Sequence, residues 1–264
     1  MRIIFISGDH LRHKYISQSL SDDSFEIFRI FQKREDFVPQ FPDNIDNDLK
    51  DIYEKHFKRR EEAELNFFNE AVDYQISKNI LINSRDFKNG KLLKIVSEIQ
   101  PDMILSYGCN LLSEDILKLS KSHTWNIHGG LSPWYRGTAT HFWPSYFLEP
   151  QFTGITLHIT SMQIDGGDIL HQTAINPLSE DGIHEHACRN VKFFADQLNQ
   201  IILKLTRLDR ILGISQGTNG RLWTNSMWSP NHLKVIYELF DDKVNKYCIE
   251  NRIIDRKPKL ISLI

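Results

Sequence analysis

Three side chains with complementary chemistry lie in the middle of the chain. Asn126 and His128 stand two positions apart at the end of a strand-like run, so on an extended chain both project to the same side. Asp165 follows 37 positions after His128 and precedes two glycines, a pattern typical of a tight turn. Acyl transfer needs a neutral donor for the developing oxyanion, a proton shuttle, and an anion that orients the imidazole. The three residues together predict such a site.

Each of these features alone is usually structural. An Asn-x-His pair is common, and the aspartate of an Asp-Gly-Gly turn most often accepts a hydrogen bond from its own backbone. The segment 129–137, GGLSPWYRG, directly follows His128. It adds glycines that let the backbone approach a ligand, together with a proline, two aromatic residues and an arginine. The combination, at the ends of predicted elements, is what indicates chemistry.

Strands and helices alternate through the first half of the chain. Short apolar runs predict strands, and the amphipathic stretches 49–75 and 92–99 predict helices. The first of these stretches carries Phe57, Leu65, Phe68 and Val72 at helical spacing. The expected strands are Arg2 to Ser7, Phe25 to Phe31, Asn79 to Ile82, Asp102 to Tyr107 and Thr124 to His128. This alternation favours a mostly parallel sheet, in which ligands bind beyond the carboxyl ends of the strands.

The pattern changes near residue 150. The runs 153–160 and 168–175 predict an antiparallel strand pair, because the short link 161–167 between them contains glycine. A helix is expected over 184–205, then a turn at 217–220 and an amphipathic helix over 230–249.

The expected fold class is therefore α/β. It combines a mostly parallel, Rossmann-like sheet flanked by helices with an antiparallel β pair and a short C-terminal helical extension. We divide the chain into a catalytic domain, 1–180, and an extension, 181–264. The extension closes over the substrate or forms a dimer contact, and the sequence leaves a homodimer open.

The composition is that of an ordinary globular protein. The 264 residues are 41% hydrophobic and 25% charged, and their formal charge of −2 gives no general attraction to a phosphate backbone. Cys109, Cys188 and Cys248 are odd in number and far apart, which predicts reduced thiols. No apolar run is long enough to span a membrane, and the N-terminus enters a strand without a signal peptide. We expect a cytoplasmic protein without nucleic-acid or membrane partners.

Three motifs, as a linked set, resemble the folate-dependent formyltransferases. This family includes glycinamide ribonucleotide transformylase, methionyl-tRNA formyltransferase and the nucleotide-sugar N-formyltransferases. Its hallmark is Asn-x-His at a strand end, then Leu-x-Pro-x-x-(Arg/Lys)-Gly, then an Asp-x-Gly turn between strands. In this chain the motifs are Asn126-Ile-His128, 131–137 (LSPWYRG) and Asp165-Gly-Gly167. The element order is similar from residue 1 to about 175, and the specific motifs lie between 102 and 170.

Two departures from the family pattern bear on the acceptor and on one loop. Gly129 and Gly130 replace the usual Pro-Ser after the histidine, which loosens the loop without removing a catalytic group. The first strand ends in Ser-Gly-Asp-His rather than in the glycine-rich phosphate loop of the transformylase. Glycinamide ribonucleotide is therefore not the expected acceptor.

The resemblance implies N10-formyltetrahydrofolate as the formyl donor, a primary amine as the acceptor, and no metal. Asn126 would donate its side-chain N–H to the oxyanion, and His128 would stabilise that oxyanion and move a proton. Asp165 would orient His128, help to deprotonate the attacking ammonium, and help to seat the pterin. The implied activity is that of a one-carbon group transferase.

In similar enzymes the pterin lies between the loop after the fourth strand and the loop with the aspartate. Leu111 and Leu112 would supply apolar wall, although they read equally well as core residues. Cys109 is interpreted as wall, because no neighbouring base makes it a nucleophile. The expected cofactor-binding residues are Tyr107, Gly108, Leu111, Leu112, Met162, Ile164 and Asp165.

The acceptor is inferred from a missing module and two loops. A tRNA acceptor would need a basic RNA-binding extension, which this slightly acidic chain does not offer. A loop near a helix start suits a diphosphate, although a solvated first turn is an equal alternative. The expected substrate-binding residues are Arg12, His13, Lys14, Gly130, Trp134, Tyr135 and Arg136. The best match is the group that formylates nucleotide-linked 4-amino-4,6-dideoxyhexoses for surface polysaccharides, and the segment 220–228 closes over the acceptor or contacts a second subunit.

Several rival interpretations stay open at this point. The same three residues would serve an enzyme that formylates an aminoacyl group on a tRNA or a peptidyl carrier. A non-catalytic module that binds folate or a nucleotide sugar is weaker, because all three chemical groups are present. His184, His186 and Cys188 are metal-ligand types, but positions two apart on a helix point away from each other. A dehydrogenase is disfavoured, because no Gly-x-Gly-x-x-Gly follows the first strand.

Overall fold

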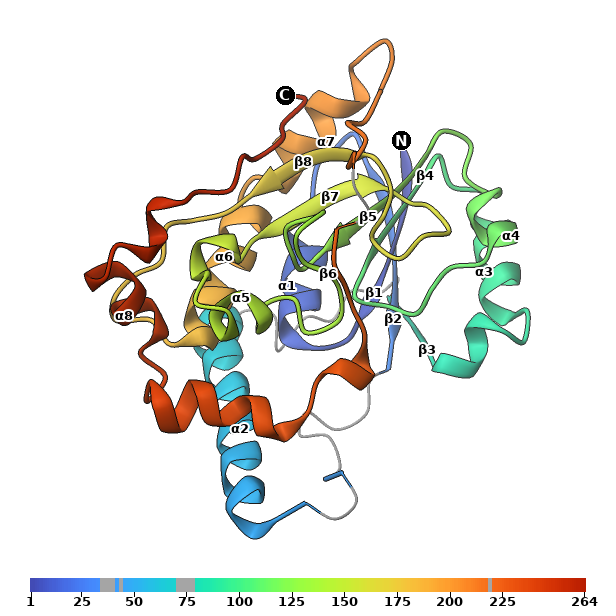
Figure 1. Ribbon diagram of the computed structural model, residues 1–264. Helices are drawn as coiled ribbons and strands as arrows, with labels where there is room; N and C mark the ends of the chain where they lie inside the picture. The colour runs from blue at the N-terminus through green and yellow to red at the C-terminus, as the bar shows by residue number, and fades with distance from the viewer. Residues whose placement is uncertain (34–40, 43–44, 70–78, 218–219) are drawn as a thin grey trace.

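The computed structural model describes residues 1–33, 41–42, 45–69, 79–217 and 220–264 (Figure 1). Its centre is a seven-stranded sheet in the order β3-β2-β1-β4-β5-β7-β8. The strands are β1 (Arg2–Gly8), β2 (Glu26–Gln32), β3 (Asn79–Ile82), β4 (Met103–Tyr107), β5 (His123–His128), β7 (Ile155–Ile159) and β8 (Ile169–Thr173). The first five are parallel, whereas β7 runs antiparallel to β5 and β8 antiparallel to β7. The predicted fold class is confirmed.

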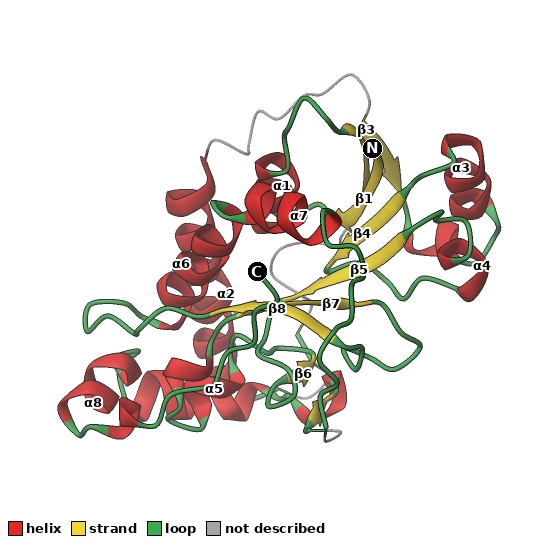
Figure 2. Ribbon diagram, turned by 90° about the horizontal axis from the view of Figure 1, so that it is seen from above, coloured by secondary structure: helices red, strands yellow, loops and turns green. Residues whose placement is uncertain are grey.

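Helices cover both faces of the sheet (Figure 2). Ile3 and Phe5 of β1 pack in one core with α1 (Leu11–Ser19), α2 (Asn47–Phe68), α6 (Ile183–Ala195) and α7 (Leu198–Thr206). Ile4 and Ile6 face the opposite way, toward α3 (Lys91–Ile99) and α4 (Glu114–Leu117). Successive side chains of a strand alternate between faces, so a strand covered on both sides must be apolar throughout. Among the described residues, no helix has the length and apolar character needed to cross a bilayer.

A third apolar cluster lies beside the sheet rather than on it. It joins α2 to α5 (Trp143–Tyr146), α8 (Val244–Glu250) and several aromatic residues of the C-terminal part. Tyr53 and Phe57 of α2 belong to this cluster, whereas Phe68 near the end of the same helix packs against the sheet. The helix therefore bridges the sheet and the aromatic cluster (Figure 1).

The C-terminal part of the chain pairs with earlier strands in three places, two of them at the edge of the central sheet. The two-residue strand β9 (Leu222–Trp223) pairs in parallel with β6 (Arg136–Gly137), in the loop after β5. Ile214 and Ser262 form antiparallel bridges with Ile169 and His171 of β8. These bridges supply partners along the edge of the sheet, where backbone groups would otherwise be unpaired.

Two long helices expected from the sequence are interrupted in the structure. The stretch 184–205 forms two helices, α6 and α7, and Gln197 between them donates through Nε2 to the carbonyl of Phe193 at the end of α6. The stretch 230–249 forms a 3₁₀ turn at Pro230–His232, a π-helical turn at Val235–Leu239, and α8. Asp241 and Asp242 adopt positive φ of 49° and 57° before α8, and this backbone conformation ends a helix.

The α2 prediction is correct in type and partly wrong in its buried face. Phe57 and Phe68 are buried as expected, but Leu65 is 43% exposed. Val72 and the end of the predicted stretch at 70–75 lie outside the described residues, as does part of the turn expected at 217–220. The predicted strands match the observed ones to within two residues at their ends.

Candidate active site

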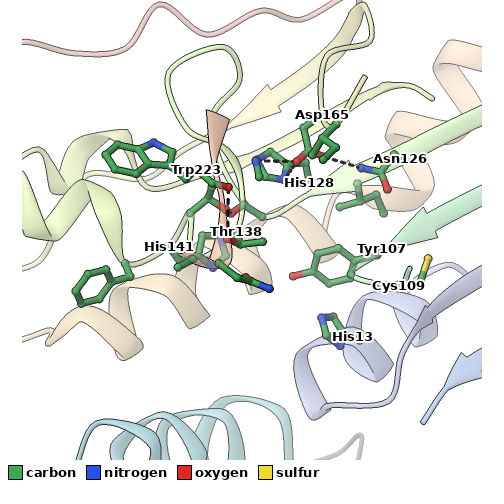
Figure 3. A pocket seen from close by; sticks show the side chains of 18 of the residues that line it. His13, Tyr107, Cys109, Asn126, His128, Thr138, His141, Asp165 and Trp223 are labelled. Carbon is green, nitrogen blue, oxygen red and sulfur yellow. Dashed lines mark hydrogen bonds and ion pairs between the residues drawn. The ribbon is translucent and has the colours of Figure 1, made fainter. Parts of the chain in front are cut away.

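A cavity of about 1020 Å³ lies at the carboxyl ends of the central strands. It adjoins the point between β1 and β4 where the strand order changes direction, the usual ligand position in open α/β sheets. Figure 3 shows His13 from α1, Tyr107 at the end of β4, and Asn126 and His128 from β5 around this space. Asp165 reaches the same wall from the loop that joins β7 to β8.

The carboxylate of Asp165 lies against polar groups from two segments of the chain, β5 and the loop that follows it. Its Oδ2 accepts from the backbone N–H of Gly137 at 2.9 Å and lies 3.2 Å from Nδ1 of His128. Its Oδ1 accepts from Nδ2 of Asn126 at 3.3 Å. The predicted amide, imidazole and carboxylate therefore meet at one point, and the side chain of Asp165 is only 13% exposed.

The amide of Asn126 has a defined orientation. Its Oδ1 accepts from the hydroxyl of Ser106 at 2.8 Å, which turns Nδ2 toward Asp165 and His158. Nδ1 of His158 lies 2.8 Å from the carbonyl oxygen of Ile159 and must carry a proton, so the neutral ring accepts through Nε2 from Asn126 at 3.1 Å. Both N–H groups of Asn126 thus have partners, and donation to a substrate oxygen would replace one of them.

The ring of His128 is fixed at one nitrogen and available at the other. Nε2 lies 2.8 Å from the carbonyl oxygen of Tyr135, which can only accept, so Nε2 carries a proton. Nδ1 faces the carboxylate of Asp165 and is the atom that can take up or release a proton. A buried imidazole beside a carboxylate has the arrangement of a general acid–base pair.

Burial and charge act in opposite directions on these two groups. Burial alone would raise the pKa of the Asp165 carboxyl, but the His128 charge, the adjacent His158 ring and the hydrogen bond from the Gly137 N–H bring that pKa down to about 2. Burial lowers the pKa of His128 below its usual range, against the pull of Asp165 and of the Tyr135 carbonyl. The carboxylate therefore stays charged at physiological pH, and burial favours the neutral, proton-accepting form of the imidazole.

The opposite end of the cavity is lined by α2, and it carries permanent positive charge. Nε of Arg12 lies 2.6 Å and Nε of Arg60 3.0 Å from the same oxygen of Glu64, which is fully buried. Both arginines line the cavity, and two guanidinium groups against one carboxylate leave a net positive charge there. Burial would raise the pKa of Glu64, but Arg12 and Arg60 bring it down to about 2.

Histidine and aromatic side chains line the same end. Tyr237 connects two cavity-lining imidazoles, because its hydroxyl lies 3.0 Å from Nδ1 of His56 and 3.4 Å from Nε2 of His184. Burial lowers the pKa of His56 to about 3 and the pKa of His184 well below its usual value, so both rings are neutral at physiological pH. The remaining walls at this end include Tyr53, Phe57, Phe142, Trp223 and Trp228.

The structure places most of the expected cofactor-binding residues on the cavity wall. Those that line it are Tyr107, Gly108, Leu111, Leu112, Ile164 and Asp165, together with Cys109. Leu112 is buried, whereas Leu111 is 70% exposed and presents an apolar surface at the cavity mouth. Met162 does not line the cavity and is 64% exposed, because the loop turns it outward.

The expected substrate-binding residues divide between the cavity and its surroundings. Arg12 and His13 line the cavity, but Arg12 is paired with Glu64 and is not a solvated first-turn cation. Lys14, Gly130, Trp134, Tyr135 and Arg136 lie outside the lining. Two of these have structural partners: the Tyr135 hydroxyl donates to Glu149 at 2.8 Å, and Arg136 donates through Nη2 to the carbonyl of Ile164 at 2.6 Å.

Sequence reasoning missed His158, Ser106 and the cavity-facing side of α2. His158 pairs with Asn126 across the antiparallel β5–β7 register, a long-range fact that no local spacing reveals. Tyr53, His56, Phe57 and Arg60 follow the spacing i, i+3, i+4, i+7, which is also that of an ordinary buried helix face. The presence of a histidine and an arginine on that otherwise aromatic face was the signal in the sequence that could have indicated a functional surface.

The metal-ligand types on α6 serve other purposes. His184 contacts Tyr237, and Nε2 of His186 lies 2.9 Å from the carbonyl oxygen of Pro150. Cys188 of α6 is buried in the core that this helix shares with the sheet. Within the described ranges, no group of three or more histidine, cysteine or acidic side chains is placed to hold a metal ion.

Solved structures of formyltransferases share this fold. The chain has a TM-score of 0.54 and 15% identity with a sugar N-formyltransferase from a Shewanella species, covering 86% of this chain and 78% of that one. The formyltransferase PseJ from Anoxybacillus kamchatkensis was solved with UDP-4,6-dideoxy-4-formamido-L-AltNAc and tetrahydrofolate. Its TM-score with this chain is 0.51 and its identity 18%, and the match covers 93% of this chain and 97% of that one. For phosphoribosylglycinamide formyltransferase from Anaplasma phagocytophilum, the TM-score is 0.55 and the identity 17%, and the match covers 85% of this chain and 97% of that one.

Comparison of amino-acid sequences gives evidence for family membership, which the shared fold alone does not. The curated relative ArnA, the bifunctional polymyxin resistance protein of Wigglesworthia glossinidia brevipalpis, is 35% identical over 124 residues. This match covers 46% of the chain and 19% of ArnA, so the chain spans about a fifth of that relative. The family model described as formyl transferase matches residues 1–198, which include all three motif residues. The chain belongs to the formyl transferase family.

Proposed function

We propose that the protein is an N-formyltransferase that moves the formyl group of N10-formyltetrahydrofolate to the primary amine of a nucleotide-linked amino-dideoxy sugar. The observation that carries this proposal is the meeting of Asn126, His128 and Asp165 on one cavity wall. Their donor, proton-accepting and anionic groups are those that acyl transfer to an amine requires. Family membership gives the transferred group independent support.

The end of the cavity near β4 has the chemistry to hold a reduced pterin. Leu111, Leu112 and Ile164 present apolar surface, and the hydroxyl of Thr160 is buried there without a hydrogen-bond partner among the described residues. A flat, partly apolar ring with polar edges fits a pocket of this kind. When bound, the folate would supply an activated formyl group.

Asn126 would act on the formyl oxygen. As the amine adds to the carbonyl carbon, negative charge develops on that oxygen, and an N–H of Asn126 would donate to it in exchange for its contact with His158 or Asp165. The Ser106 hydroxyl keeps the amide nitrogen turned toward this point. The backbone does not need to reorganise, because Ser106 on β4 and Asn126 on β5 lie on neighbouring paired strands.

Asp165 and His128 would handle the proton of the amine. The carboxylate is charged at physiological pH and lies 3.2 Å from Nδ1 of His128, so a proton released by the attacking nitrogen can be shared between them. The Gly137 N–H and the Tyr135 carbonyl fix the two groups in orientation. Nδ1 would then carry the proton from the amine to N10 as the C–N10 bond breaks and tetrahydrofolate leaves.

The α2 end of the cavity suits an acceptor with an anionic group and a flat ring. Arg12, Arg60 and Glu64 together supply net positive charge, and Tyr53 and Trp228 supply aromatic surface. A nucleotide-linked sugar has both a diphosphate and a base. The name of one structural neighbour as a sugar N-formyltransferase, and the complex of PseJ with a UDP-linked formamido sugar, support this acceptor class.

The proposal is tested by offering the purified protein N10-formyltetrahydrofolate with each candidate acceptor. The candidates are UDP- and dTDP-linked 4-amino-4,6-dideoxyhexoses, glycinamide ribonucleotide and methionyl-tRNA. We expect tetrahydrofolate release together with a mass increase of one formyl group on a nucleotide sugar, and neither with the Asn126→Ala variant. Formylation of glycinamide ribonucleotide or of methionyl-tRNA alone, or of no acceptor, would overturn the assignment.

A further inference from the structure

A short segment beyond the family-matched residues crosses the loop that carries Asp165. Residues 213–217 follow α7 and lie outside the matched range 1–198. Ile214 exchanges two backbone hydrogen bonds with Ile169 at the start of β8, each of 2.8 Å. A Cβ at Gly213 would come within 2.5 Å of the Asp168 side chain, so the segment lies directly against the loop.

Gln216 in this segment makes two bonds to the backbone on either side of the turn. Its Nε2 donates to the carbonyl of Asp165 and to the carbonyl of Gly167, both at 2.8 Å. Because both partners can only accept, the side-chain nitrogen must face them, and the orientation of the amide is determined. Gln216 does not line the cavity and touches none of the side chains of Asn126, His128 and Asp165 through a bond in the described part of the chain.

The turn at Asp165 needs such support because of its backbone conformation. Asp165 has a φ of +47°, a left-handed conformation that a non-glycine residue keeps only when its surroundings hold it. Rotation of the Asp165 peptide would carry the carboxylate away from Nδ1 of His128 and from the Gly137 N–H. The second bond to the Asp165 carbonyl, from the Ser132 hydroxyl, is longer at 3.3 Å.

We propose that Gln216 is a positioning residue for formyl transfer, which fixes the Asp165 carboxylate against His128 through the backbone of the 165–167 turn. The role rests on the proposed function, because its effect on turnover is an effect on that reaction. It also places part of the active-site support in a segment outside the family-matched residues.

Three variants test this role. Gln216→Met keeps the side-chain length and removes both donors, and Gln216→Glu replaces the donors with acceptors that repel the two carbonyls. Gln197→Met is the matched control, because Gln197 also donates through Nε2 to a backbone carbonyl, but that carbonyl belongs to Phe193 on α6 and not to the 165–167 turn. Folding of all three is checked by urea unfolding, with midpoints close to that of the wild type expected.

The expected result is a split between turnover and acceptor binding. Displacement of a catalytic group by an ångström costs on the order of 10²-fold in rate, so we expect kcat to fall about 10–100-fold in Gln216→Met and at least as far in Gln216→Glu. The acceptor KM should stay within about twofold, because the α2 end of the cavity is untouched. Gln197→Met should behave as the wild type, and an unchanged kcat in both Gln216 variants would overturn the role.

A second readout does not depend on the reaction. The titration of His128, followed by NMR with labelled histidine, should move to lower pH in Gln216→Met, because a displaced carboxylate no longer favours the charged imidazole. An unchanged His128 titration in both variants would overturn the positioning role even if the wild type formylates a nucleotide sugar. Conversely, a wild type inactive toward every acceptor would defeat the proposed function while this titration still decides the role of Gln216.

Discussion

The two ends of the cavity each depend on one buried carboxylate, and the partners of the two differ in kind. Asp165 is surrounded by an imidazole, an amide and a backbone N–H, whereas Glu64 is bound by two guanidinium groups. Both carboxyls have a pKa of about 2. Two different environments therefore each keep a buried carboxyl group ionised.

The difference lies in what the partners can do next. An imidazole can take up and release a proton near neutral pH, and an amide N–H can exchange one acceptor for another. A guanidinium keeps its proton under all physiological conditions. The region around Asp165 is therefore suited to moving charge during a reaction, and the region around Glu64 to holding a fixed charge for the fold and for an anionic ligand. Substitutions at the two carboxylates should separate these two properties.

The largest expected effect is a loss of stability in Glu64→Gln. The change keeps the size of the side chain but leaves the Arg12 and Arg60 guanidinium groups against each other without a counter-charge. Breaking a buried ion pair at one partner costs about 3–5 kcal/mol, so the free energy of unfolding should fall by that amount in urea titration.

Glu114→Gln provides the control for this loss, because Glu114 pairs with Lys118 at a largely exposed site. Its free energy of unfolding should change by less than about 1 kcal/mol. Equal effects of the two substitutions would contradict the structural role of Glu64.

The next effect is a loss of activity in variants that keep their fold. Asp165→Asn keeps the shape and tolerates the positive φ, and Asn126→Ala removes the proposed donor for the oxyanion. Each should lower kcat by about 10²–10³, which corresponds to about 3–4 kcal/mol of transition-state stabilisation. Circular dichroism should show an intact fold in both, and a wild-type rate in either would remove that residue from the reaction.

Acid should weaken the fold through both carboxylates. Their folded-state pKa of about 2 lies below the ordinary values of 3.8 for aspartate and 4.5 for glutamate, so each contributes stability that is complete above the ordinary value and is lost as the pH falls toward 2. A shift of this size corresponds to on the order of 2–3 kcal/mol for each buried group. Urea unfolding at several pH values should show a flatter acid loss in Glu64→Gln and in Asp165→Asn than in the wild type.

The smallest effect is expected at the cavity mouth. Leu111 is 70% exposed, so Leu111→Ala should leave stability unchanged and raise the KM for the folate a few-fold, with kcat preserved. Leu81→Ala is the matched control, because Leu81 is 59% exposed on β3 and does not line the cavity. A change in KM with Leu81→Ala as large as that with Leu111→Ala would argue against a folate site at this end.

The region around Asp165 was largely readable from the sequence, because its residues occur in motifs whose local spacing already implies geometry. Asn126 and His128 share one strand face, and the two glycines after Asp165 predict the turn on which it stands. The region around Glu64 was not readable in this way. Arg12 and Glu64 are 52 residues apart, and the stretch around Arg60 resembled an ordinary amphipathic helix, so the pairing depends on how α2 packs beside α1.

The amino-acid sequence by itself determined the order of strands and helices, the α/β class, and the identity of the three chemically complementary residues. These follow from periodicity and from short-range spacing, which act within one element. Only the tertiary structure decided that His158 meets Asn126, that Arg12 is held by Glu64, and that Gln216 reaches the Asp165 turn. Such contacts join residues far apart in the chain, and the packing of whole elements selects them, because no local preference favours one distant partner over another.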